Sequence, residues 1–218
     1  MKKKILIVQA DFGSKDFKNI PKQKEGDYEI EHRFYNDTNF PSRINSLQPR
    51  FKGKIPKMLE WYFYEADYYI WMDSYYEITT DYIIDLTKYV KDHDICLNKH
   101  NVRKSISEEV NFVLRGLDSN NYLKSRYIGE PLKEQLESYQ KDSSFEDNNL
   151  FSMGFFIYTK NLVKNREYNL MTDWFLHNSI WTIQDQISFP YLLHKHKINY
   201  NVFDFDGIFK NPYANYKR

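Results

Sequence analysis

The sequence contains little cysteine and glycine, no long apolar run and almost no net charge. Cys96 is the only cysteine, so no internal disulfide can form, which indicates a reducing compartment. Seven glycines without a GxGxxG or GxxxxGK pattern argue against a glycine-rich phosphate loop. No apolar stretch reaches the ~18 residues of a membrane-spanning helix, and a net charge of +1 argues against nucleic acid as a partner. We expect a cytoplasmic protein without a transmembrane segment, with peripheral association at the inner face of the membrane as the alternative.

The chain has 218 residues, enough for one domain with a full core, and apolar and amphipathic stretches alternate along it. Strands are predicted at 4–10, 28–35, 68–73, 94–97, 150–158 and 199–203. Helices are predicted at 55–64, 80–90, 105–116, 130–141, 161–178 and 182–196, and residues 207–218 are predicted to be a tail. Pro56 fits the first turn of the first helix. The alternation favours a single-domain α/β fold, with a mostly parallel central sheet flanked by helices.

The most informative segment is 68–78, where an aromatic run ends in Asp73 and Ser74. A carboxylate at the carboxyl end of a buried strand projects into the crevice where α/β proteins bind ligands. There it could hold a divalent cation against a diphosphate, with Ser74 as a further contact to the donor; the alternative is a solvated Asp that caps the next turn. Gly154, inside an apolar run, predicts a close approach of a ligand or of another backbone segment. Simple packing is the alternative for Gly154.

Four segments carry a resemblance to a known family: 45–59, 68–74, 100–109 and 181–190. These segments occur in an order that resembles the glycosyltransferase-like family formerly catalogued as a domain of unknown function. The resemblance covers roughly residues 1–206. That family occurs in plants and in bacterial surface-polysaccharide clusters, and belongs with the GT-A nucleotide-diphospho-sugar transferases. The resemblance implies a GT-A (Rossmann-like) fold and the transfer of a sugar from a nucleotide-diphosphate donor to a glycan or lipid-linked acceptor, in surface polysaccharide biosynthesis.

Many GT-A enzymes hold Mn²⁺ or Mg²⁺ on the diphosphate with an Asp-x-Asp motif, so the resemblance implies such a cofactor. This chain departs from the motif, because Asp73-Ser74-Tyr75 has one carboxylate. Glu77 is about 13 Å along an extended chain from Asp73, and would join the site only if the strand turns after Ser74. The resemblance implies a further ligand near the C-terminus, and Asp204, directly after the last predicted strand, is preferred to Asp206, His194 and His196.

Two further candidates for donor contacts lie in the first third of the chain. Lys57 is predicted near a helix N-terminus, where phosphate is favoured and a lysine adds a point charge. Arg50 and Lys54 are weaker cases of the same kind, and an ordinary solvated lysine is the alternative. Asp11 follows the first predicted strand, and the resemblance implies contact with the base or ribose of the donor.

His100 and Arg103 follow the predicted strand at 94–97, and we expect them at the same sheet edge as Asp73. Arg103 suits a diphosphate or an anionic sugar, because its planar guanidinium binds oxyanions with two parallel hydrogen bonds. His100 would contact the donor sugar. The alternative is a pair of loop residues tied to Glu108 or Glu109.

Asp185 and Gln186 lie near the start of the predicted helix at 182–196. The resemblance implies contacts with the acceptor or the sugar hydroxyls here, and in an inverting enzyme Asp185 would take the proton from the attacking hydroxyl. An acid stabilised by the helix dipole is the alternative for Asp185. Two alternatives to the whole assignment stay open: a non-catalytic nucleotide-sugar or carbohydrate-binding module, and a metal-dependent hydrolase on the same scaffold.

Overall fold

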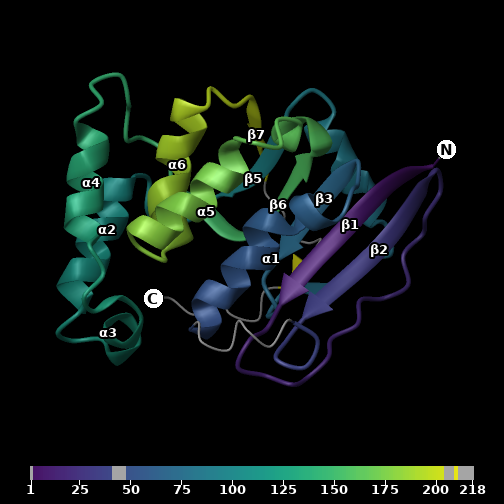
Figure 1. The fold of residues 1–218 in the computed structure, drawn as a ribbon, viewed down its shortest axis with the longest axis horizontal. Coiled ribbons are helices and arrows are strands. Elements are labelled where there is room, and N and C mark those ends of the chain that lie inside the picture. The colour runs from purple at the N-terminus through teal and green to yellow at the C-terminus, as the bar shows by residue number, and fades with distance from the viewer. Residues whose placement is uncertain (1, 41–47, 204–208, 211–218) are drawn as a thin grey trace.

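The computed structural model describes residues 2–40, 48–203 and 209–210, and shows a central sheet surrounded by helices (Figure 1). The strands of this sheet are β1 (Lys3–Ala10), β2 (Tyr28–Tyr35), β3 (Tyr68–Met72), β5 (Ile95–Lys99), β6 (Phe151–Thr159) and β7 (Tyr200–Val202). Their order is β2-β1-β3-β6-β5-β7. All neighbours pair in parallel except β6, which is antiparallel to both β3 and β5. The predicted α/β fold with a mostly parallel sheet is confirmed.

In Figure 1, helices lie over one face of the sheet and a further group of helices lies at one end of it. On one face lie α1 (Pro49–Phe63), α5 (Leu170–Ile180) and α6 (Asp185–Lys195), and on the other lies the 3-10 helix η2 (Ile83–Val90). A third cluster joins α2 (Ile106–Gly116), α3 (Asn121–Tyr127) and α4 (Leu132–Gln140) to α6. The short 3-10 helix η3 (Lys160–Val163) follows β6, and β4 (Glu77–Ile78) pairs with β8 (Phe209–Lys210) outside the main sheet. Two residues of the predicted tail therefore form a strand.

The alternation of side chains along the strands sorts the core into two layers. In β1, Leu6 packs under α1, α5 and α6, whereas Ile7 belongs to the layer under η2. In β3, Trp71 lies in the layer under α1, α5 and α6. Asp73 has the same parity as Trp71, so the strand directs it toward the face that these three helices cover.

The first predicted helix is longer than the sequence indicates. It begins at Pro49, which occupies its first turn, and Pro56 lies inside it. The placement of Pro56 in the first turn was therefore wrong. A proline inside a helix removes one backbone donor and costs stability, but Met58 and Trp61, both fully buried on the far side of Pro56, pack into the core. This tertiary packing stabilises a helix that local sequence preference would end.

Two other predicted helices also differ in the structure. The segment 80–90 forms a 3-10 helix that begins at Ile83, and the segment 161–178 divides into η3 and α5. The start of α5 is defined by Asn169, whose side chain accepts the N–H groups of Met171 and Thr172 in a capping box. The sequence analysis also missed α3, which Asn120 caps in a similar way. None of the helices in the described part of the chain has the length and apolar character that a bilayer crossing requires.

Candidate functional site

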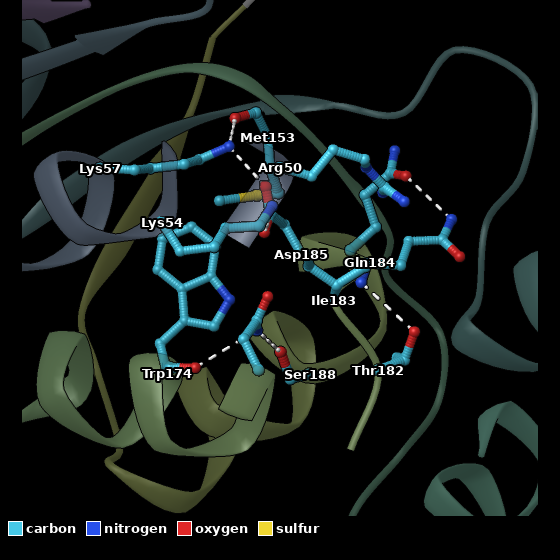
Figure 2. Close-up of polar contacts among 12 residues, drawn as sticks. Arg50, Lys54, Lys57, Met153, Trp174, Thr182, Ile183, Gln184, Asp185 and Ser188 are labelled. Atoms are coloured by element: carbon cyan, nitrogen blue, oxygen red, sulfur yellow. Dashed lines mark hydrogen bonds and ion pairs between the residues drawn. The ribbon is translucent and has the colours of Figure 1, made fainter. Parts of the chain in front are cut away.

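Polar groups from four parts of the chain converge at the carboxyl end of β3. Asp73 follows β3, Lys57 comes from α1, Asp185 is the first residue of α6, and Met153 lies in β6. The Lys57 Nζ atom donates to Asp185 Oδ2 and to the Met153 carbonyl, both at 2.6 Å (Figure 2). The same ammonium lies 3.7 Å from Asp73 Oδ1. The structure therefore brings together three residues that the sequence analysis selected from distant parts of the chain.

The position of Asp73 is set by its neighbours on β3 and β6. Its backbone N–H donates to the Gly154 carbonyl at 2.7 Å, and its Oδ1 accepts from the indole N–H of Trp71 at 2.8 Å. The Tyr75 hydroxyl is also hydrogen-bonded to Asp73, and burial, with the charge of Asp73, raises the pKa of Tyr75 above its ordinary value. Tyr75 therefore stays protonated and keeps its O–H as a donor.

Gly154 makes room for the turn that follows β3. A Cβ at this position would lie 2.8 Å from the Tyr75 hydroxyl, 2.8 Å from Tyr76 Cε2 and 3.1 Å from Asp73 Oδ2. The close approach at Gly154 is made by side chains, and not by the backbone that was predicted; its cause is the turn in which the Tyr76 N–H donates to the Asp73 carbonyl at 3.0 Å. After this turn, Glu77 enters β4.

Asp185 is held between two ammonium groups, as Figure 2 shows. Its Oδ1 accepts from Lys54 Nζ and its Oδ2 from Lys57 Nζ. Burial raises the pKa of Asp185, but the charges and hydrogen bonds of the two lysines outweigh it and lower the pKa to about 2. Burial lowers the pKa of Lys54 to about 8, although the charge of Asp185 opposes this shift. Asp185 is thus an anion over the whole physiological pH range.

One face of α1 supplies most of the positive charge of the site. Arg50, Lys54 and Lys57 follow one another at spacings of four and three residues, which places them on one side of a helix. The first turn of α1 contains no acidic residue, so nothing there opposes the positive end of the helix dipole. Lys54, treated as a weaker case than Lys57, is an equal partner of Asp185. The spacing of these residues is visible in the sequence, but the predicted helix began at residue 55 and so excluded Arg50 and Lys54.

A second chain of polar contacts reaches the site from α2. Arg103 Nε donates to Glu109 Oε2, and the buried Gln184 donates from Nε2 to Glu109 Oε1. Gln184 Nε2 also lies 3.3 Å from Gln186 Oε1. The structure therefore contains the alternative predicted for Arg103, a loop residue bonded to Glu109. Gln184, which the sequence analysis did not select, connects this pair to the residues next to Asp185.

His100 shapes the loop after β5. Its Nδ1 accepts the backbone N–H groups of Val102 at 3.1 Å and Arg103 at 2.9 Å, while its own backbone N–H donates to the Leu150 carbonyl at 2.9 Å. Burial and the charge of Arg103 lower the pKa of His100 to about 4. The imidazole is therefore neutral at physiological pH, and its Nδ1 serves as an acceptor for the loop.

Asp11 and Ser74 follow the parallel neighbours β1 and β3, so both lie at the carboxyl edge of the sheet. The Asp11 N–H donates to the Tyr35 carbonyl at 2.8 Å. The Ser74 carbonyl accepts from Lys18 Nζ at 2.6 Å. Their positions agree with the sheet edge expected for donor contacts, and those contacts stay a prediction.

The residues considered as metal ligands lie in different places. His194 Nε2 is 3.5 Å from Asp142 Oδ2, and His196 Nε2 is 2.9 Å from Asp173 Oδ2. Asp204 and Asp206 are outside the described residues. Among the residues that are described, no group of three or more His, Cys, Asp or Glu side chains is arranged to hold a metal ion. The metal role of Asp73 with Asp204 stays a prediction.

Comparisons with known proteins agree with this architecture. The family model described as TOD1/MUCI70, glycosyltransferase-like domain, matches residues 43–213. Among solved structures, the chain is similar to the WbbM bifunctional glycosyltransferase in its apo form, with a TM-score of 0.50 and 10% identity over 94% of this chain and 39% of that chain. It is also similar to mouse xyloside xylosyltransferase 1, with a TM-score of 0.42 and 10% identity over 81% of this chain and 64% of that one.

The chain therefore spans less than two thirds of the length of either structure. A comparison with curated proteins gave no match. At 10% identity the similarity to WbbM concerns the fold alone. Since the family match covers the residues of the site from α1 to α6, the chain belongs to the TOD1/MUCI70 glycosyltransferase-like domain family.

Proposed function

We propose that this protein transfers a sugar from a nucleotide-diphosphate donor to a hydroxyl of a glycan or lipid-linked acceptor, in surface polysaccharide biosynthesis. The observation that carries the proposal is the convergence of Lys57, Asp73 and Asp185 at the carboxyl end of β3. This edge of an α/β sheet is where such folds bind ligands. Membership of a glycosyltransferase-like family supports the reaction class.

The chemistry follows from charge. The acceptor oxygen forms a bond to the anomeric carbon as the bond from that carbon to the diphosphate oxygen breaks. Negative charge grows on the departing nucleoside diphosphate, whose phosphate oxygen takes the proton of the attacking hydroxyl. Fixed positive groups stabilise this growing charge in the transition state more than they stabilise the intact donor, which lowers the barrier. Lys57, Lys54 and Arg50 are the cations that we assign to this task, whereas Arg103 is already paired with Glu109. Asp73 and Ser74 would contact the donor at the end of β3, with Asp11 at the end of β1.

Asp185 receives a different role from the base predicted in the sequence analysis. A general base works best when its pKa lies near the operating pH, and the pKa of Asp185 is lowered to about 2. A carboxylate held by two lysines is better suited to orient those lysines and to accept hydrogen bonds from sugar hydroxyls. Gln186, next to it on α6, would supply an amide to the same sugar.

The test is a binding screen followed by a transfer assay. Nucleoside diphosphates and nucleotide sugars would be tested by thermal shift, where a ligand at ~100 times its dissociation constant stabilises the fold by about 2.7 kcal/mol. The donor found would then be incubated with glycan and lipid-linked acceptors, and the products identified by mass spectrometry. We expect one nucleotide to bind, an acceptor-dependent product to form, and the product to be lost in Asp73→Asn.

The matched control is Glu137→Gln, which removes an exposed carboxylate on α4, 3.6 Å from Lys133 and outside the site. It should bind and turn over the donor as the unchanged chain does. Binding without any product would support the non-catalytic module instead. If free sugar is released at the same rate in the presence and in the absence of each acceptor, the result would support the hydrolase.

A further inference from the structure

The ammonium of Lys57 occupies a built cation site beside Asp73. Its side chain is 4% exposed, and its Nζ faces three oxygen atoms, from Asp73, Asp185 and Met153. These oxygens come from three different elements, so α1 delivers one charge to the point where β3, β6 and α6 meet. The position of this charge is set by the fold and does not depend on a flexible side chain in solvent.

Aromatic rings complete the surroundings of this ammonium. The Lys57 Nζ atom lies 5.3 Å from the ring centre of Trp71, 5.7 Å from that of Trp174 and 5.9 Å from that of Phe156. Cations within about 6 Å of aromatic ring centres are attracted to the electron-rich face, most strongly when they are shielded from water. The three rings therefore add attractive contacts to the oxygen atoms that hold the Lys57 ammonium in place.

The oxygens of Asp73 do not fit a divalent cation well. Oδ1 already accepts the indole N–H of Trp71 and faces Lys57, and the Tyr75 hydroxyl is hydrogen-bonded to the same carboxylate. Mg²⁺ and similar hard cations require several oxygen ligands in a regular arrangement. A dication at Oδ1 would also lie next to the Lys57 ammonium, and like charges at this separation repel.

We propose that Lys57, with Lys54 and Arg50 on the same face of α1, supplies the positive charge that a metal ion provides beside the diphosphate in other GT-A enzymes. Donor binding and turnover then require no divalent cation. This inference rests on the proposed function, because it concerns the same donor site. It replaces the predicted Mn²⁺ or Mg²⁺ with a group that the chain itself contains.

The experiment is isothermal titration of UDP, GDP, ADP, CDP and dTDP into the full chain, once in excess EDTA and once in Mn²⁺. We expect one of these diphosphates to bind in EDTA with an affinity within about threefold of that in Mn²⁺. In EDTA, Lys57→Met should weaken this binding about tenfold or more, and Lys57→Arg should weaken it less because it keeps the charge. Lys133→Met, at an exposed position on α4, is the control and should bind like the unchanged chain.

Two results would overturn the inference while leaving the proposed function intact: binding of a diphosphate only in Mn²⁺, or unchanged binding in EDTA by Lys57→Met. Absence of binding by all five probes under both conditions would remove the proposed function and this inference together. Near-UV circular dichroism shows whether Lys57→Met is folded. If it is not, the comparison of EDTA with Mn²⁺ in the unchanged chain, with Lys57→Arg beside it, decides the question.

Discussion

Replacing Asp185 by asparagine tests the charge arrangement that organises the site. The pKa of Asp185 is lowered from 3.8 to about 2, and a shift of this size corresponds to about 2 to 3 kcal/mol of stability at neutral pH. The variant also leaves Lys54 and Lys57 without their shared counter-ion in a buried position. Removal of one partner from a buried ion pair costs about 3–5 kcal/mol. We therefore expect Asp185→Asn to lower the free energy of unfolding by about 3–5 kcal/mol.

The pH dependence of this loss has a definite sign. In the unchanged chain, Asp185 contributes stability above pH 3.8, and the contribution disappears as the pH falls through about 2. In Asp185→Asn the carboxylate no longer opposes the effect of burial, so the pKa of Lys54 should fall below its present value of about 8. The unfolded chain then binds more protons than the folded chain near neutral pH. Stability of the variant should therefore rise with pH between about 6 and 8, more steeply than in the unchanged chain.

Urea unfolding followed by tryptophan fluorescence, repeated across this pH range, measures both quantities. Glu137→Gln, which removes an exposed carboxylate 3.6 Å from Lys133, is the control and should cost no more than about 0.5 kcal/mol. A loss in Asp185→Asn as small as that of the control would refute the assignment of a buried anion between two lysines. A loss that is large but independent of pH would refute the role of Lys54 in it.

Two further variants test other parts of the structure. Gly154→Ala places a methyl group 2.8 Å from the Tyr75 hydroxyl, so we expect a loss of about 1–3 kcal/mol in urea unfolding together with weaker donor binding. Its control is Gly53→Ala, where the added Cβ meets nothing within 4 Å, and the free energy of unfolding should rise by about 0.5–1 kcal/mol. Equal effects of the two substitutions would contradict the close approach at Gly154. Burial raises the pKa of Glu60 from 4.5 to about 7, although the hydroxyl of Tyr35 donates to the carboxylate. The contribution of Glu60 to stability is therefore present below pH 4.5 and is lost as the pH rises through about 7. Glu60→Gln should therefore be more stable than the unchanged chain above pH 7, by about 1–3 kcal/mol, and a variant less stable at pH 8 would show that the carboxylate is not destabilised by burial.

Local sequence patterns were sufficient for the six strands of the main sheet and for the acid at the end of β3, but not for β4 and β8. Continuous apolar runs such as 5–8 and 69–72 indicate buried strands, because a strand covered on both faces needs apolar residues at every position. Asp73 is recognisable because it ends such a run. These features depend on a few neighbouring residues, and one sequence displays them directly.

Helix boundaries around proline were less predictable. Pro49 and Pro56 both fit a first turn by local rules, and burial of residues on both sides of Pro56 selects the earlier start. The error had a consequence for the site, because it separated Lys54 and Arg50 from the helix that carries Lys57. Local preference is a fraction of a kcal/mol per residue for most residue types, so tertiary packing decides such boundaries.

By itself, the sequence indicated the fold class, the family and three residues of the candidate site, Lys57, Asp73 and Asp185, since each depends on composition, short patterns or order along the chain. Only the tertiary structure decided which of those residues meet. The antiparallel strand β6 inserts between β3 and β5 and brings the carbonyls of Met153 and Gly154 to Lys57 and Asp73. Lys57 and Asp185, 128 residues apart, become a hydrogen-bonded ion pair. The strand order that creates these contacts is set by the packing of the whole sheet against its helices, and no local pattern in the chain carries that information.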